Sequence, residues 1–459
     1  MMNSYKGNIP FEEIPTLWNF FYPVTGNLET VKDNAPDLVK DYLNDDKKTE
    51  GLTSLYLHIP FCDTICTFCP FIKTTKYAKT LEPYVDALIK EIKMLSSAPR
   101  LKGRKIDSIY IGGGTPSVLE PDQIKRLGEA ITSHFDLADD YEWTFECAAL
   151  TTTEDRVQAM AEVGVNRGSF GVQTFNQKFK KMFNLQWSDQ QVKHTRDLMM
   201  HYFNACNMDL LYQLPGQTTD ELLEDLHKSI SLNTSSIDVY PLEYLAAEKN
   251  FLNKINKNKY PSPPLPLEKV HQNKLVYDTL KQNGYFQNYV YTFTKEDAKY
   301  KRFKFSETIY GNYDDEFFAL GTGGHSTFKG LSYDNVGDIN TYIEMINKEI
   351  FPISRAMEYH AYERGLIFFP KKMRISKKQL EKHPLDNYYY QKLRELESKN
   401  MVKETADEFI LTDEGKLWFS NIMVELMPPE QKKALEFAIS SMQETKNWKE
   451  ESKTAVTST

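Results

Sequence analysis

The segment Tyr56-Leu-His-Ile-Pro-Phe-Cys62-Asp-Thr-Ile-Cys66-Thr-Phe-Cys69 sets three cysteines within eight residues, directly after an apolar run that predicts a β-strand. Thiolates at this spacing converge from one short loop on a single [4Fe–4S] cluster, and they leave its fourth iron without a protein ligand. Such an open position makes a metal centre reactive, because an external molecule can bind there. We therefore predict a cluster held by Cys62, Cys66 and Cys69.

Two other interpretations of these cysteines are a structural zinc site and plain burial in the core. Zinc needs a fourth ligand, normally from a second Cys or His pair at a matching distance. Here only His58 stands close by, on the preceding strand. The two remaining cysteines, Cys147 and Cys206, fall on predicted strands and are interpreted as small core residues. An odd total of five cysteines, three of them crowded together, argues against a disulfide framework.

Around this loop, residues 54–245 alternate apolar runs with amphipathic stretches, the pattern of repeated βα units around a parallel sheet. The predicted strands are Leu55–Pro60, Ser108–Gly112, Trp143–Ala148, Gly168–Thr174, Met208–Leu214 and Ile237–Leu242. The stretch Leu81–Leu95 carries apolar residues three and four apart, which predicts a helix with one buried face. The predicted fold class is α/β, a partial (β/α)6 barrel with a second, C-terminal domain.

The predicted regions are an N-terminal extension (1–50), the barrel (51–250), a barrel extension on the substrate side (251–355), a C-terminal domain (356–445) and a disordered tail (446–459). Prolines crowd the stretch Tyr260–Pro266 and interrupt the βα pattern, because proline continues neither a helix nor a central strand. The C-terminal domain is mainly helical and winged-helix-like, with a hairpin at Phe409–Gly415. Its lack of a basic recognition helix favours a scaffold role over DNA binding.

The composition is that of an ordinary soluble enzyme, with 41% hydrophobic and 26% charged residues. A net charge of −8 gives no basic face for a nucleic-acid backbone, so we expect no nucleic-acid partner. No apolar run approaches the length of about 18 residues that spans a membrane. The start, Met1–Pro10, lacks the layout of a secretory signal. We therefore expect a cytoplasmic protein.

The run from Tyr56 through Cys69 resembles the radical S-adenosylmethionine (SAM) superfamily, and within it the branch of oxygen-independent coproporphyrinogen III oxidase. The resemblance implies that the open iron binds SAM and that an electron entering through the cluster cleaves it. The resulting 5′-deoxyadenosyl radical is expected to abstract a hydrogen atom from the substrate. The resemblance also implies a low-potential electron donor, such as flavodoxin or ferredoxin, as a partner.

The same resemblance assigns the residues that contact SAM. The matching positions are Tyr56, Phe68, Gly113, Gly114, Thr115, Glu146, Gln173 and Asp209. The glycines belong to a Gly-Gly-Thr-Pro element that binds the methionine end of SAM in the family. Glu146 stands at the carboxyl end of a predicted strand, the end at which parallel barrels carry their sites. Equivalents of Gln173 and Asp209 contact a second SAM molecule, so two molecules are expected.

Two departures from the oxidase pattern bear on the substrate. Phe71 occupies the position of a fourth cysteine, and Leu185 follows Asn184 where the oxidases carry an arginine. A cationic fork that would pair with a carboxylate has become an apolar side chain. Both departures argue against porphyrinogen decarboxylation.

The same branch contains class C radical methyltransferases, which use a second SAM as methyl donor and act on sp² carbons of planar aromatic acceptors. We therefore predict methyl transfer to a planar apolar acceptor such as the ring of menaquinone, with transient membrane contact if the acceptor is a quinone. Two alternatives stand beside it. One is a tetrapyrrole enzyme, either coproporphyrinogen oxidase or an anaerobic haem-degrading enzyme. The other is a haem chaperone, for which His58 or His325 would be candidate ligands.

Overall fold

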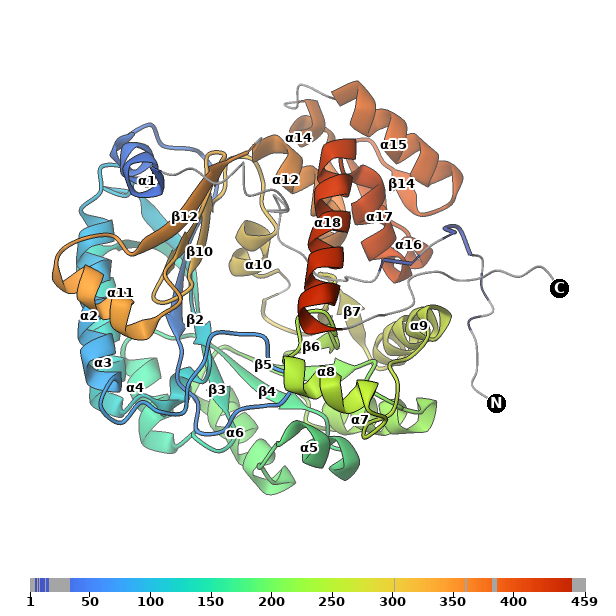
Figure 1. The fold of residues 1–459 in the computed structure, drawn as a ribbon, viewed down its shortest axis with the longest axis horizontal. Coiled ribbons are helices and arrows are strands. Elements are labelled where there is room, and N and C mark those ends of the chain that lie inside the picture. Colours follow the sequence, from blue (N-terminus) through green and yellow to red (C-terminus); the bar gives the residue numbers. More distant parts are fainter. Residues whose placement is uncertain are drawn as a thin grey trace.

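The computed structural model describes residues 5, 7, 9–12, 14–15, 34–300, 302–359, 361–381 and 386–447. Parallel strands in chain order form the centre of one twelve-stranded sheet, each hydrogen-bonded to the next (Figure 1). They are β1 (Thr53–Ile59), β2 (Lys105–Gly113), β3 (Asp136–Ala148), β4 (Arg167–Gln173), β5 (Ala205–Tyr212) and β6 (Ser236–Pro241). All six predicted strands are present. The third begins at Asp136, seven residues before its predicted start at Trp143.

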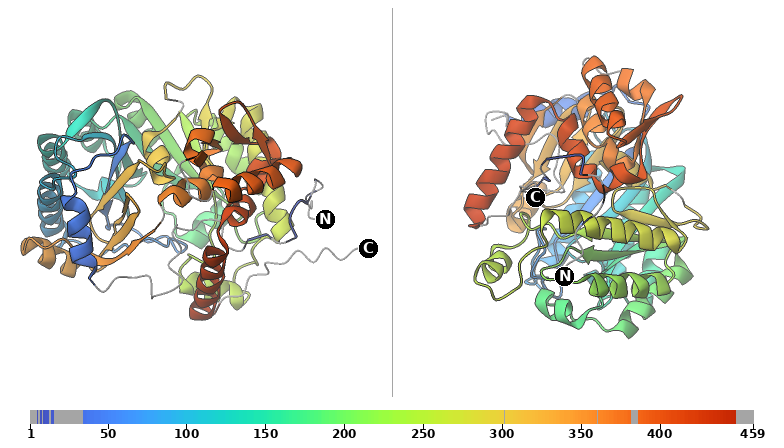
Figure 2. Two further views of the ribbon diagram at one scale, coloured as in Figure 1. Left: turned by 90° about the horizontal axis from the view of Figure 1, so that it is seen from above. Right: turned by 90° about the vertical axis from the view of Figure 1, so that its right-hand side faces the viewer.

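Helices between these strands cover the outer face of the sheet, as the two views in Figure 2 make plain. They are α2 (Leu81–Ser96), η2 (Pro116–Val118, a 3₁₀ turn), α3 (Pro121–His134), α4 (Glu154–Glu162), α5 (Gln177–Phe183), α6 (Asp189–Tyr202) and α7 (Thr219–Ser231). The predicted apolar face of α2 is buried at Val85, Leu88 and Ile92. Capping boxes start α6 at Ser188 and α7 at Thr218, where side chains satisfy free backbone amides.

The two faces of the central strands differ in polarity. Along β3, Trp143 and Phe145 are fully buried in the apolar core. The alternate residues Glu142, Thr144 and Glu146 instead accept hydrogen bonds from Lys304, Arg167 and Tyr110, respectively. The core therefore lies between sheet and helices, and the concave face of the sheet is left for polar chemistry.

Further strands extend the sheet at both edges. Beside β1 lie parallel β9 (Glu316–Leu320) and then antiparallel β10 (His325–Phe328), β11 (Leu331–Asn335) and β12 (Ile353–Glu358); beside β6 lie β8 (Thr292–Lys295) and β7 (Tyr285–Gln287). Arg100 forms a completely buried ion pair with Glu316 at the start of β9. Helices α1 (Ala35–Asn44) and α11 (Ile339–Asn347) contact β12 and α2, respectively.

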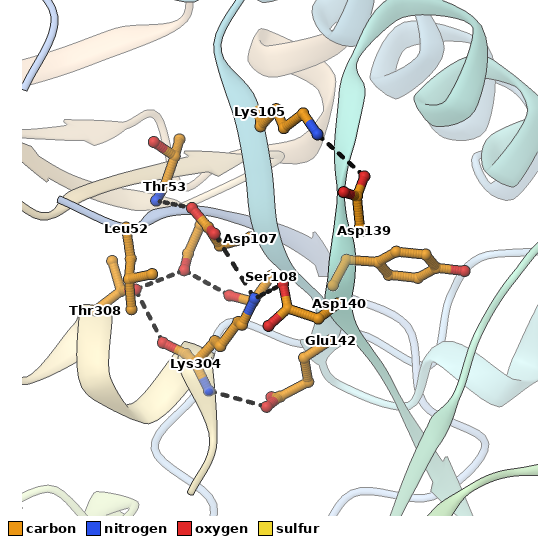
Figure 3. Close-up of polar contacts among 12 residues, drawn as sticks. Leu52, Thr53, Lys105, Asp107, Ser108, Asp139, Asp140, Glu142, Lys304 and Thr308 are labelled. Atoms are coloured by element: carbon orange, nitrogen blue, oxygen red, sulfur yellow. Dashed lines mark hydrogen bonds and ion pairs between the residues drawn. The ribbon is translucent and has the colours of Figure 1, made fainter. Parts of the chain in front are cut away.

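The short helix α10 (Lys304–Ile309) closes the end of the barrel where the parallel strands begin (Figure 3). The backbone N–H of Lys304 donates to Glu142, and its ammonium pairs with Asp140 at 2.6 Å and with Asp107 at 3.7 Å. Phe305 stacks on Tyr110 inside the barrel, with ring centroids 4.3 Å apart. Helix α10 therefore occupies this end of the barrel, and parallel barrels carry their sites at the other end, where the strands finish.

The C-terminal module follows the sheet and is mainly helical. Its elements are α12 (Ala361–Ile367), α13 (Phe369–Lys372), β13 (Arg374–Ser376), α14 (Lys377–Glu381), α15 (Asp386–Ser398), β14 (Val402–Glu404), β15 (Glu408–Leu411), α16 (Asp413–Leu417), α17 (Phe419–Leu426) and α18 (Pro429–Lys446). The three short strands form a separate sheet, and the predicted helix is present as α15. The hairpin predicted at Phe409–Gly415 was placed too late in the chain, because β15 is the second strand of a hairpin with β14 and is followed directly by α16. The module lies against α9 (Pro266–Gln282), where Asn273 donates to the Leu417 carbonyl.

The remaining helix, α8 (Lys249–Asn256), follows β6. The disordered tail was predicted from residue 446, but α18 continues through Lys446. The rest of the predicted tail, from 448 onward, lies outside the described residues, as does most of the first 33 residues of the predicted N-terminal extension. In the part of the chain that the structure describes, the helices are too short or too polar for any of them to cross a membrane.

Candidate functional site

The cysteine loop leaves the carboxyl end of β1 and is tied back at its base. The Cys62 amide donates to the Thr74 carbonyl at 3.0 Å, and the Thr74 amide donates to the Pro60 carbonyl at 2.8 Å. Within the loop, the Cys69 amide donates to the Cys66 carbonyl at 3.2 Å, which makes the turn that brings these two residues together. Backbone hydrogen bonds therefore join the two ends of the loop and fix its conformation.

The three thiols of the loop lie close enough to influence one another. The pKa of Cys66 is raised to about 12 by burial and then by the neighbouring Cys69 and Cys62. Burial likewise raises the pKa of Cys62, which also takes a hydrogen bond from Thr115. No compact group of three His, Cys, Asp or Glu side chains suited to a single metal ion occurs among the described residues. Three soft sulfur donors on one loop fit an iron–sulfur cluster, whose thiolates bind different irons.

The glycine element lies directly against this loop. The Gly114 amide donates to the Ile59 carbonyl at 2.8 Å, and the Thr115 amide donates to the Phe61 carbonyl at 2.7 Å. A Cβ at Gly114 would lie 2.9 Å from the sulfur of Cys62, a contact that only glycine avoids. The structure therefore brings Gly114 and Thr115 together with the first cysteine, as the family resemblance implies.

Glu146 connects the glycine element to the barrel interior. One of its oxygens accepts from the Tyr110 hydroxyl at 2.6 Å, and the other accepts from the Gly113 amide at 3.1 Å. Glu146 is half-buried, and the removal of its carboxylate from water raises its pKa, while the hydrogen bonds from Tyr110 and Gly113 act in the opposite direction. Gly113 has a φ of +121°, which permits this approach of its amide.

Tyr56 and Phe68 have different aromatic partners. Tyr56 lies within the barrel on β1, hydrogen-bonded to the Nδ1 of His58 at 2.9 Å and stacked at 6.2 Å on Tyr110. Phe68 contacts Phe183 at the end of α5, edge to face, with centroids 4.9 Å apart. Tyr56 therefore belongs to an aromatic cluster in the barrel, whereas Phe68 packs the cysteine loop against α5.

The two residues assigned to a second SAM occupy the far side of the barrel. Gln173 ends β4 with a φ of +71°, which turns the chain away from the strand. Asp209 on β5 is paired in register with Asp238 on β6, and the Asn207 amide donates to both carboxylates, at 2.8 and 3.1 Å. Burial raises the pKa of Asp209 well above its ordinary value, and the nearby Asp238 and Glu146 raise it further.

Several interior residues did not emerge from the sequence analysis. Tyr110, Arg167 and Asp238 all reach the barrel interior, and Arg167 is fully buried among Glu142, Asp238 and Asp209, which raise its pKa against the effect of burial. The signal was available in the alternation of side chains. Residues two apart on a strand share a face, so a polar residue in each apolar run marks the inner face.

The remaining cysteines and the candidate histidines have structural partners. Cys147 and Cys206 are buried on β3 and β5, and the Cys206 thiol lies 3.8 Å from the sulfur of Met199. His58 contacts Tyr56 through one ring nitrogen and the Ile72 carbonyl through the other. His325 contacts Asp334 at 2.5 Å and Ser332 at 3.4 Å.

Comparisons with known proteins agree with this geometry. A sequence model of the radical SAM superfamily matches residues 56–228. The chain is 29% identical over 374 residues to the haem chaperone HemW of Lactococcus lactis, covering 79% of this chain and 94% of the relative. It is 27% identical over 436 residues to anaerobilin synthase of Escherichia coli O157:H7, covering 92% and 93%.

The solved structure of coproporphyrinogen III oxidase (HemN) from Escherichia coli has a TM-score of 0.73 to this chain at 23% identity, covering 88% of this chain and 96% of that one. This likeness confirms the predicted fold class, an α/β fold with a parallel sheet and a C-terminal helical domain. The match to the superfamily implies the [4Fe–4S] cluster and SAM as cofactors. Residues 56–228 therefore carry the radical SAM pattern, and most of the chain is similar to HemW, to anaerobilin synthase and to oxygen-independent coproporphyrinogen III oxidase.

Proposed function

We propose that this protein is a radical SAM enzyme that modifies a tetrapyrrole such as haem. The observation that carries the proposal is the end-to-end similarity to anaerobilin synthase, which extends over 92% of this chain and 93% of that protein. A second relative is named as a haem chaperone, so two relatives of different activity both have names that refer to tetrapyrroles. The tetrapyrrole alternative is thus better supported than the menaquinone ring that the sequence analysis favoured.

Different residues of this chain would bind the cluster and SAM. Cys62, Cys66 and Cys69 would hold the cluster, which supplies the electron for reductive cleavage of SAM. Glu146 would accept hydrogen bonds from the amino group of SAM, because it is a half-buried carboxylate near the carboxyl end of β3 and beside the glycine element. Gly114, beside Cys62, leaves the space that the methionine end needs.

An enzyme of the coproporphyrinogen oxidase type is less well supported than one that acts on another tetrapyrrole. Phe71 is 60% exposed at the position of the oxidases' fourth cysteine. Leu185 packs against the apolar core next to Asn184, whose side chain donates to the Ile65 carbonyl in the cysteine loop. An apolar residue beside the cluster loop cannot pair with a propionate carboxylate as an arginine does.

The other alternative is a haem chaperone, which binds haem without turnover. The contacts of the two candidate histidines argue against it. His58 and His325 each engage both ring nitrogens with neighbouring groups, so binding haem iron would break existing contacts. In addition, the Gly113 amide donates to Glu146, which supports a SAM site at the glycine element. These features favour an enzyme.

Methyl transfer to the tetrapyrrole is a more specific possibility within this proposal. It would need a second SAM molecule, for which Gln173 and Asp209 are the expected contacts.

Anaerobic incubation with haem, SAM and a chemical reductant tests both the substrate and the type of reaction. We expect 5′-deoxyadenosine and loss of the haem Soret band, and S-adenosylhomocysteine in addition if methyl transfer occurs. Cleavage of SAM with unaltered haem, together with decarboxylation of coproporphyrinogen III, would instead establish the oxidase.

A further inference from the structure

A surface hollow of about 680 Å³ lies beside the cysteine loop. One wall is the loop itself, at Ile65, Cys66 and Thr67, and the opposite wall is formed by α8 and the residues that follow it. The lining residues are Ile65, Cys66, Thr67, Lys73, Glu248, Asn250, Phe251, Asn253, Lys254, Lys257 and Lys259. We call this feature the lysine hollow.

The lysine hollow is positively charged in a chain whose net charge is −8. Its one carboxylate, Glu248, is 3.0 Å from the ammonium of Lys73. Lys254 donates to the Tyr260 hydroxyl at 3.1 Å, a neutral partner. Lys257 and Lys259 are exposed, and no ion pair with either is recorded in the described part of the chain. Three positive charges are therefore left to face a ligand.

The positively charged lysine hollow lies next to Cys66, and therefore next to the expected cluster. Cys66 is one of the three expected cluster ligands, and it forms part of the wall. Ile65, beside it, is 38% exposed and offers an apolar contact at the same place. A partner seated here would approach the cluster more directly than one bound to the helical outer face of the barrel.

We propose that the lysine hollow docks a small acidic electron-transfer protein that reduces the cluster. The inference rests on the proposed radical SAM function and adds a partner site to it. In the step concerned, one electron leaves the reduced donor and enters the cluster, and no atom or proton is transferred. Complementary charge steers such encounters and fixes their orientation, whereas the short apolar contact at Ile65 keeps them transient.

Charge reversal at the exposed lysines tests the docking directly. Reduced flavodoxin, an acidic protein, is titrated into cluster-loaded protein by calorimetry at two salt concentrations. For Lys257→Glu with Lys259→Glu we expect Kd to rise by about tenfold or more at low salt, and the wild-type Kd to rise with salt. The matched control is Lys102→Glu with Lys403→Glu, two exposed lysines outside the hollow, which should leave Kd unchanged. An unchanged Kd in the first variant overturns the proposal.

A kinetic arm separates docking from function. SAM cleavage is driven either by flavodoxin or by methyl viologen, a small cationic mediator that does not depend on the lysines. The hollow variant should lose rate only with flavodoxin. If the wild type cleaves no SAM with viologen, the proposed function is wrong. The docking proposal is then judged by the calorimetric Kd alone. If the variant raises the KM of an anionic tetrapyrrole with both reductants, the hollow is a substrate site and the proposal is wrong.

Discussion

The Tyr110 hydroxyl on β2 donates to the Glu146 carboxylate on β3 at 2.6 Å, across two neighbouring parallel strands. The second oxygen of Glu146 accepts from the Gly113 amide at 3.1 Å, so the carboxylate is held from two directions. Both donors favour the charged form of Glu146 in a site where burial disfavours it. The two donors therefore orient the carboxylate of Glu146 beside the glycine element, where the ammonium group of SAM is expected.

Glu146→Gln should weaken SAM binding. The substitution keeps the size of the side chain but removes the charge that pairs with the amino group, and a hydrogen bond to a charged group contributes about 1.5–3 kcal/mol, or roughly ten- to hundredfold in Kd. Equilibrium dialysis with cluster-loaded protein measures the change. Tyr110→Phe is the matched control, because it keeps the carboxylate and removes one donor, and it should have the smaller effect. Equal affinities for wild type and Glu146→Gln would show that this carboxylate does not bind SAM.

The cysteines of the loop and those of the core should respond differently to alanine. Cys62→Ala, Cys66→Ala and Cys69→Ala should each abolish the cluster absorbance and SAM cleavage, because each removes one of the three thiolates. Iron and sulfide content after anaerobic reconstitution provides the measurement. Cys147→Ala and Cys206→Ala are internal controls, since both residues are buried on strands, and they should retain full iron. A cluster of normal content in any loop variant would mean that the ligands are assigned wrongly.

Gly113→Ala should destabilise the protein. Its φ of +121° is a conformation that residues with a Cβ rarely adopt, and the added Cβ would lie 2.7 Å from the His58 ring. Backbone strain of this kind costs about 1–3 kcal/mol. Gly284→Ala has a φ of +79° with nothing within 4 Å of the new Cβ, so it isolates the strain without the clash. Urea unfolding should give the highest free energy of unfolding for the wild type, a lower one for Gly284→Ala and the lowest for Gly113→Ala. The reverse order of the two variants would contradict the role of the His58 contact.

The parallel half of the fold was predictable because each of its strands is an apolar run followed by an amphipathic helix. The strands at the edges were not predicted. Between Tyr285 and Glu358, the runs are three to six residues long and pair through short turns, so their periodicity is too brief to distinguish from loop sequence. Local pattern carries no information about which distant strand they extend.

The candidate site divides in the same way. Cys62, Cys66 and Cys69 are within one loop, and their spacing alone indicates a cluster. Asp238 faces Asp209 only because β5 and β6 pair in a particular register, which sequence separation does not reveal. The acceptor is a further step removed, since Phe71 and Leu185 say which contacts are missing and not which substrate replaces them. The proposed tetrapyrrole rests instead on similarity over most of the chain.

A buried lysine in the C-terminal module should make stability depend on pH. Burial lowers the pKa of Lys371 to about 7, and the nearby Arg364 lowers it further, while Glu243 acts in the opposite direction. In the unfolded chain the pKa returns to its ordinary value of 10.5. Between pH 7 and 10.5 the unfolded state therefore binds more protons than the folded state, and the free energy of unfolding rises with pH, by at most about 1.4 kcal/mol per unit from this group. In Lys371→Met the rise between pH 7 and 9 should shrink, because the side chain keeps its length and its contact with the Phe368 ring but no longer titrates. Lys371→Arg stays charged throughout and should be the least stable of the three proteins at pH 9. Urea unfolding at the two pH values measures this, and an equal rise in wild type and Lys371→Met would assign the pH dependence to another group.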